Sequence, residues 1–254
     1  MKPRLVRLGV ASLVPALAAG ALTAFGGRPA DNGIGGLTAK QILARSLATL
    51  KGETNLVLKG SIKIASAKIG LDIESSGHGN DSAGTLSSSA SSAGFVGTIR
   101  FVDAGGAVYL NAGPALWREF GSSGTGLTAK QYAALVSTLS NRWIKLGASD
   151  AKSFAQSFGQ LTNTTKLATG LVSGGTKASK GKATTIDGVH VLALNDGSGG
   201  TLYIALAGPP RPIELSGSSA GSSGTITFGY PSRLTITAPA SSLTLQQVAQ
   251  RLGG

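Results

Sequence analysis

Apolar and polar side chains alternate through residues 56–73, and this pattern constrains the fold more than any other part of the chain. The apolar positions are even up to residue 64 and odd from residue 67 onward. A two-residue turn at Ala65 and Ser66 produces such a change of parity, because both strands of a hairpin keep their apolar side chains on the same face of a sheet. The register then places Ile62 opposite Ile69. The sequence therefore predicts an antiparallel hairpin with one apolar face.

The composition favours one β-rich domain over residues 37–254. The 38 glycines make up about 15% of the chain, against a usual value of ~7%, and this glycine content suits short strands joined by tight turns. An apolar content of 41% excludes a disordered chain. With no cysteine, stability must come from packing and not from disulfides.

Residues 1–25 resemble a secretion signal. A basic head (Lys2, Arg4 and Arg7) precedes an apolar run that Pro15 interrupts. Cleavage after residue 18, 21 or 24 fits the small residues there, and retention as an anchor is the alternative. Residues 22–27 are also similar to a lipobox, but Phe25 stands where the acylated cysteine would be.

Residues 26–36 are expected to form a flexible, Gly-rich tether before the domain. Without residues 1–25, the formal net charge of +12 falls to +9. This charge favours an anionic membrane surface or acidic wall polymers as partners. Since the basic residues are scattered and form no run, general solubility is the first explanation of the charge.

Three capping boxes predict helix starts. Thr38 with Gln41 and Thr128 with Gln131 lie in the same hexapeptide, and Thr244 with Gln247 repeats the spacing. A further helix is predicted from residue 149. The Ser-rich run 82–92 fits either a strand or a loop. Other strands are predicted at 95–102, 108–110, 143–146, 189–194, 201–206, 213–215, 225–228 and 234–237.

The order of these elements resembles the LolA-like lipoprotein carriers, and in particular the LprG and LppX type of envelope lipoproteins. The blocks that carry the resemblance lie at 186–189, 200–204, 208–212 and 224–228. The resemblance implies an α+β fold in which a single curved antiparallel sheet, a half-barrel, wraps around a few short helices. It also implies an exported, non-catalytic protein that holds a lipid, glycolipid or acyl chain in an apolar cavity.

The apolar face of such a sheet offers more area than a few helices cover, so the remainder is either occupied by a ligand or filled by side chains. If a ligand binds there, the wall of the cavity and its helical plug are predicted to be Leu43, Leu47, Leu56, Leu58, Ile62, Ile64, Ile69, Leu71, Ile73, Ile99, Phe101, Val108, Leu110, Leu202 and Ile204. The alternative is a structural or signalling envelope protein with a closed core that acts through its basic surface.

No catalytic or metal site is predicted. His78 lies in a turn motif and His190 in a strand, and two isolated histidines without cysteines do not make a zinc site. Dispersed carboxylates give no acid and base pair. Aromatic residues make up only 5% of the chain, which is too few to stack the bases of a single-stranded nucleic acid. We therefore expect a protein that needs no cofactor and is not an enzyme. We also expect it to be a monomer.

Overall fold

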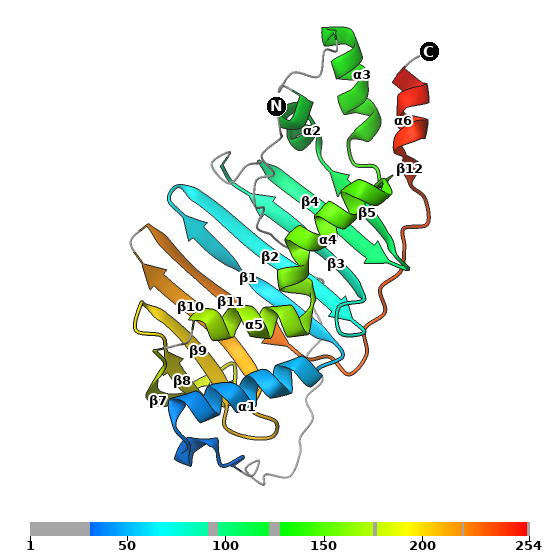
Figure 1. The fold of residues 1–254 in the computed structure, drawn as a ribbon. Helices are drawn as coiled ribbons and strands as arrows, with labels where there is room; N and C mark the ends of the chain where they lie inside the picture. Colours follow the sequence, from blue (N-terminus) through cyan, green and yellow to red (C-terminus); the bar gives the residue numbers. More distant parts are fainter. Residues whose placement is uncertain (1–30, 91–95, 122–127, 175–176, 220, 253–254) are drawn as a thin grey trace.

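The protein is described by a computed structural model over residues 31–90, 96–121, 128–174, 177–219 and 221–252. The predicted secretion signal with its lipobox-like segment, and Phe95 at the start of one predicted strand, lie outside these residues. The described part is one open, curved sheet of twelve strands with helices against it (Figure 1). This confirms the predicted α+β half-barrel.

The strands follow the chain as two antiparallel meanders that meet in the middle of the sheet. The order is β12-β6-β5-β4-β3-β2-β1-β11-β10-β9-β8-β7, and only the β12 and β6 pair is parallel. The bounds are β1 Leu56–Ile64, β2 Ala67–Ser76, β3 Asp81–Ser88, β4 Gly97–Ala104, β5 Ala107–Ala112, β6 Ile144–Lys145, β7 Ser179–Ile186, β8 Val189–Asn195, β9 Gly200–Ala205, β10 Pro212–Ser219, β11 Ser222–Gly229 and β12 Leu243–Thr244.

The β1–β2 hairpin has the predicted register. Ile62 pairs with Ile69, and Lys59 faces Asp72 on the opposite side of the sheet, where their charged groups lie 3.1 Å apart. Ala65 adopts a positive φ of 51° in the predicted turn. The alternation of apolar residues therefore fixed both the pairing and the face.

The three predicted capping boxes are present. In the first two, the Thr side chain accepts a hydrogen bond from the Gln amide three residues on, and the Gln side chain accepts one from the Thr amide. Thr244 and Gln247 exchange the same two bonds. The helices are η1 Ile34–Gly36, α1 Ala39–Gly52, α2 Pro114–Gly121, α3 Ala129–Leu139, α4 Ala148–Thr162, α5 Thr164–Gly174 and α6 Leu245–Leu252.

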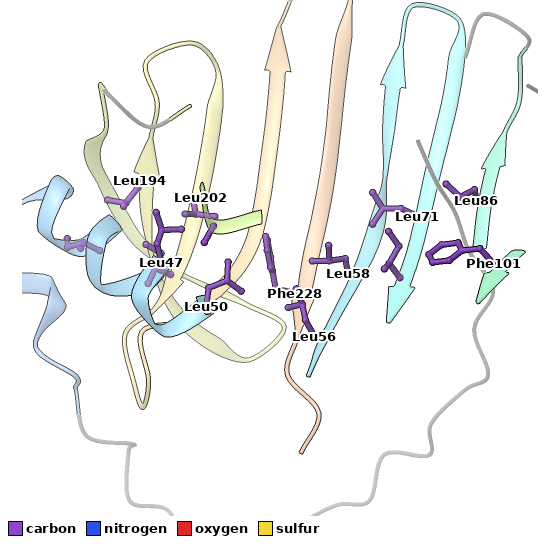
Figure 2. Packing of buried hydrophobic residues seen from close by; sticks show 14 of the residues in the cluster. Leu47, Leu50, Leu56, Leu58, Leu71, Leu86, Phe101, Leu194, Leu202 and Phe228 are labelled. Atoms are coloured by element: carbon purple, nitrogen blue, oxygen red, sulfur yellow. The ribbon is translucent and has the colours of Figure 1, made fainter. Parts of the chain in front are cut away.

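Helices α1, α5 and α4 cross one face of the sheet in succession, whereas α2, α3 and α6 gather at its β5–β6–β12 end (Figure 1). The main core lies between the sheet and the crossing helices, and Figure 2 shows its leucines lying in a row across the strands. Phe101 packs on Phe154 of α4, with the ring centroids 5.3 Å apart. At the β6–β12 end of the sheet, Leu139 of α3, Ile144 of β6 and Val248 of α6 form a small separate hydrophobic cluster.

Three stretches differ from expectation. The strand predicted at 234–237 is wrong, because β11 already pairs with β10 and β1 and offers no free edge. Helix α2 was not predicted. Residues 31–36, expected in the flexible tether, pack on the sheet instead: Ile34 is 1% exposed, and Asn32 donates its backbone N–H to the Leu206 carbonyl.

The Ser-rich run, which fitted a strand or a loop, forms β3 as far as Ser88. Ser82 and Ser88 are buried there beside Leu86, which explains the weak apolar pattern. Its glycine, Gly84, pairs with Phe101 of β4. A Cβ at Gly84 would lie 2.8 Å from the Phe101 ring, so the missing side chain makes room for the aromatic one.

Candidate functional site

Most of the predicted cavity wall lies inside the packed core. Leu43 and Leu110 are half-buried at the margin of this core, as is Ile62, and Ile64 is 48% exposed. Helices α1, α4 and α5 therefore cover the middle of the apolar face, and any space for a ligand must lie at the margins of this packing. The buried members of the set are Leu47, Leu56, Leu58, Ile69, Leu71, Ile73, Ile99, Phe101, Val108, Leu202 and Ile204.

An apolar pocket of about 260 Å³ lies where α1 and α5 approach strands β8 to β10. We call it the inner pocket. Leu43 of α1 and Leu171 of α5 line its helical side, and the sheet contributes Leu194, Leu202 and Leu215. The three strand leucines share one face because strand side chains alternate and this face points toward the helices; Asn195, Asp196 and Thr201 also line the pocket. The inner pocket is thus built like a core, but it is not filled.

A second pocket of about 440 Å³, which we call the trough, adjoins the inner pocket and shares Asp196, Gly200 and Leu215 with it. The trough runs across the strand ends of β9, β10, β11 and β1, where the tips of the hairpins extend beyond α5 (Figure 1). Leu215 pairs with Ile226, and Ile62 continues the apolar lining on β1. We call the two pockets together the groove.

Three glycines form part of the floor of the trough. Gly217 pairs with Gly200 on one side and with Gly224 on the other, and Gly224 pairs with Ile62. A Cβ at Gly224 would lie 2.8 Å from a backbone oxygen of β1, whereas a Cβ at Gly217 would meet nothing closer than 3.8 Å. Gly217 therefore leaves space that a side chain would fill, and this space belongs to the trough.

One carboxylate lies where the inner pocket and the trough meet. Asp196 accepts hydrogen bonds from the backbone N–H groups of Ser198, at 2.7 Å, and Gly200, at 2.9 Å. The bond from Ser198 and then that from Gly200 lower the pKa of Asp196, because both favour the charged form. This end of the groove therefore keeps a negative charge at neutral pH.

The described residues offer little for catalysis. His78, in the β2–β3 turn, and His190, on β8, are both exposed. Within the described ranges, no three His, Cys, Asp or Glu side chains are close enough to bind a metal ion. In the same ranges, no helix has the length and apolarity needed to cross a membrane. What the site offers chemically is an apolar surface.

Of the predicted wall residues, the structure brings Leu43, Ile62 and Leu202 to the groove. Sequence reasoning missed its other apolar members, Leu171, Leu194, Leu215 and Ile226. Leu215 and Ile226 alternate with polar residues in the predicted strands, and this signal could have found them, whereas Leu194 lies in the apolar run of the strand predicted at 189–194. No local sequence pattern predicts that Leu171 lines the groove, because it reaches the groove only through the packing of α5 on α1.

Comparisons with known proteins give structural likenesses only. No protein-family model matches the chain, and no curated protein matches it. The structure is similar to that of LprF from Mycobacterium bovis, at 13% identity and a TM-score of 0.49, over 80% of this chain and 97% of that one. It is also similar to the Mycobacterium tuberculosis lipoprotein LppX, at 15% identity and a TM-score of 0.46, over 78% and 99%.

A third similar structure is an uncharacterized conserved protein from Thermus thermophilus, at 11% identity and a TM-score of 0.36, over 82% of this chain and 98% of that one. LppX is one of the two lipoproteins that typify the resemblance found in the sequence. At these identities and TM-scores, the likenesses bear on neither ligand nor activity.

Proposed function

We propose that this protein binds an acyl chain of a lipid or lipid-anchored molecule in the groove and carries it without catalysis. The observation that supports the proposal is the inner pocket, which five leucines from two helices and three strands line without filling. Leu194 and Leu202 are buried, whereas Leu43, Leu171 and Leu215 are half-buried and keep apolar surface in contact with water. Exposed apolar surface is costly, and a hydrocarbon chain is the partner that removes most of it.

The size of the groove suits a flexible chain. The inner pocket of 260 Å³ is close to the lower limit of about 300 Å³ for small-molecule sites, and the trough extends it. Burial of each methylene contributes about 0.8 kcal/mol, so six methylenes contribute about 5 kcal/mol before the costs of association. An acyl chain therefore needs no charged anchor to bind.

The setting that we propose is the cell envelope. Residues 1–25 have the basic head and apolar run of an export signal. Phe25 in place of the lipobox cysteine excludes the thioether lipid anchor. The protein would then be released after cleavage, or held by an uncleaved signal.

A fluorescent fatty-acid probe tests the proposal directly. Leu43→Trp places a larger side chain in the inner pocket and should weaken binding of the probe at least several-fold. Arg45→Trp is the matched control, since Arg45 is exposed on the same helix and does not line the groove. The proposal fails if the wild-type protein does not bind the probe, or if both variants bind it as tightly as the wild type does.

A further inference from the structure

Two lysines face each other at the tip of the β1–β2 hairpin. Lys63 pairs directly with Lys68 on the outer face of the sheet, and both side chains are exposed. Farther along the same strands, Lys59 forms an ion pair with Asp72, whereas neither tip lysine forms a salt bridge within the described residues. Like charges placed opposite each other destabilise a sheet. This pair therefore favours an anion between or above the two ammonium groups.

The surroundings of the two lysines form a polar depression of about 580 Å³, which we call the outer pocket. Its remaining side chains are hydroxyls, which donate hydrogen bonds to anionic oxygens. They belong to Ser61, Ser216, Ser218, Ser223 and Thr225. The outer pocket thus combines two positive charges with several neutral donors and contains no carboxylate.

The outer pocket and the trough lie back to back across the sheet. They share six small residues, namely Gly199, Ser216, Gly217, Ser218, Ser223 and Gly224. The edge between the two is the row of hairpin tips, where the Ala65 amide donates to the Gly221 carbonyl. Ile64 lies at this edge, on the same face as Ile62, and is 48% exposed. A molecule in the trough therefore reaches the outer pocket by passing over an apolar tip.

We propose that the ligand is an anionic lipid whose acyl chain lies in the groove and whose phosphate or carboxylate group binds Lys63 and Lys68 over this edge. This inference rests on the proposed function and names the class of lipid. The charges at the two ends set its orientation. Asp196 directly follows β8, which lies four strands from β1, roughly 19 Å away at the usual strand spacing. It repels an anionic headgroup, which the lysine pair attracts.

Two lysolipids with the same acyl chain test the inference, because both carry a phosphate but one headgroup is anionic and the other has its charge balanced by choline. Wild-type protein should bind lysophosphatidylglycerol about 10-fold more tightly than lysophosphatidylcholine, as expected for two exposed charge contacts. This preference should shrink as salt concentration rises. Both lipids are titrated as monomers, so that no membrane surface takes part.

Lys63→Gln/Lys68→Gln should abolish the preference, because it should lower the affinity for lysophosphatidylglycerol much more than that for lysophosphatidylcholine, whose phosphate charge is balanced by its own choline. Folding should not suffer, because the substitutions remove a repulsion. Lys130→Gln/Lys152→Gln makes the same change in net charge at exposed helix positions outside the groove and the outer pocket, and should keep the preference.

Three results would overturn the inference. An unchanged preference in the Lys63→Gln/Lys68→Gln protein would refute the role of the lysines while leaving the groove intact. If wild-type protein binds neither lysolipid, the proposed function fails as well. If inorganic phosphate alone binds in a lysine-dependent manner while the two lysolipids bind equally, the site holds a free anion and not a lipid headgroup.

Discussion

Gly217→Leu should block the trough without harming the fold. Gly217 lies in the middle of β10 on the same face as Leu215, and a Cβ there has no neighbour closer than 3.8 Å. Its backbone does not have a positive φ, so no strain is expected from a side chain. Replacing a strand glycine at such a site restricts the unfolded chain and typically stabilises by about 0.4–1 kcal/mol.

The expected loss of binding follows from the displaced contacts. The four carbons of a leucine side chain take the place of about four methylenes of the ligand, which costs up to about 3 kcal/mol, or roughly 100-fold in affinity. Gly217→Ala adds a single methyl group at ordinary contact distance and should cost far less. Titration of a fatty-acid probe measures both affinities, and thermal unfolding verifies the fold. Equal affinities for the wild-type, Ala and Leu proteins would show that no chain lies across the trough.

Three further predictions concern the fold. Gly84→Ala should lower stability by about 1–3 kcal/mol in chemical denaturation, because its Cβ would lie 2.6 Å from the Asp72 carbonyl oxygen and 2.8 Å from the Phe101 ring. A denaturation midpoint equal to that of the wild type would contradict this packing. Thr38→Ala should cost about 1 kcal/mol through loss of the α1 cap, and an unchanged unfolding free energy would count against it. Burial, and then the Asp187 carboxylate, raise the pKa of Glu214. The folded state therefore loses stability as the pH rises through this pKa, and Glu214→Gln should raise Tm more at neutral than at acidic pH; an equal gain at both would refute the shift.

Local signals carried most of the fold prediction. The β1–β2 register and the capping boxes depend on residues close together in sequence, so their patterns were sufficient. The strand predicted at 234–237 shows the limit of such patterns. Its alternation is as regular as that of β11, but a hairpin with β11 needs a free edge of that strand, and the pairing of β11 with both β10 and β1 leaves none.

The site was less predictable, because its position depends on contacts between distant segments. Alternation correctly placed Leu58 and Leu202 on the same face of the sheet. It did not show that helices would cover Leu58 and leave space beside Leu202. That difference arises from the packing of α5 on α1, which no local pattern encodes. The outer pocket also joins residues of β1, β2, β10 and β11 that only the sheet order brings together.

Native mass spectrometry of the protein, purified from a lipid-containing host, is the most direct test of whether the groove holds a hydrocarbon chain. We expect a species heavier than the chain by the mass of one lipid, and Gly217→Leu should shift the population toward the bare chain. A spectrum with the bare mass alone, from protein that also fails to bind added fatty acid, would contradict the account.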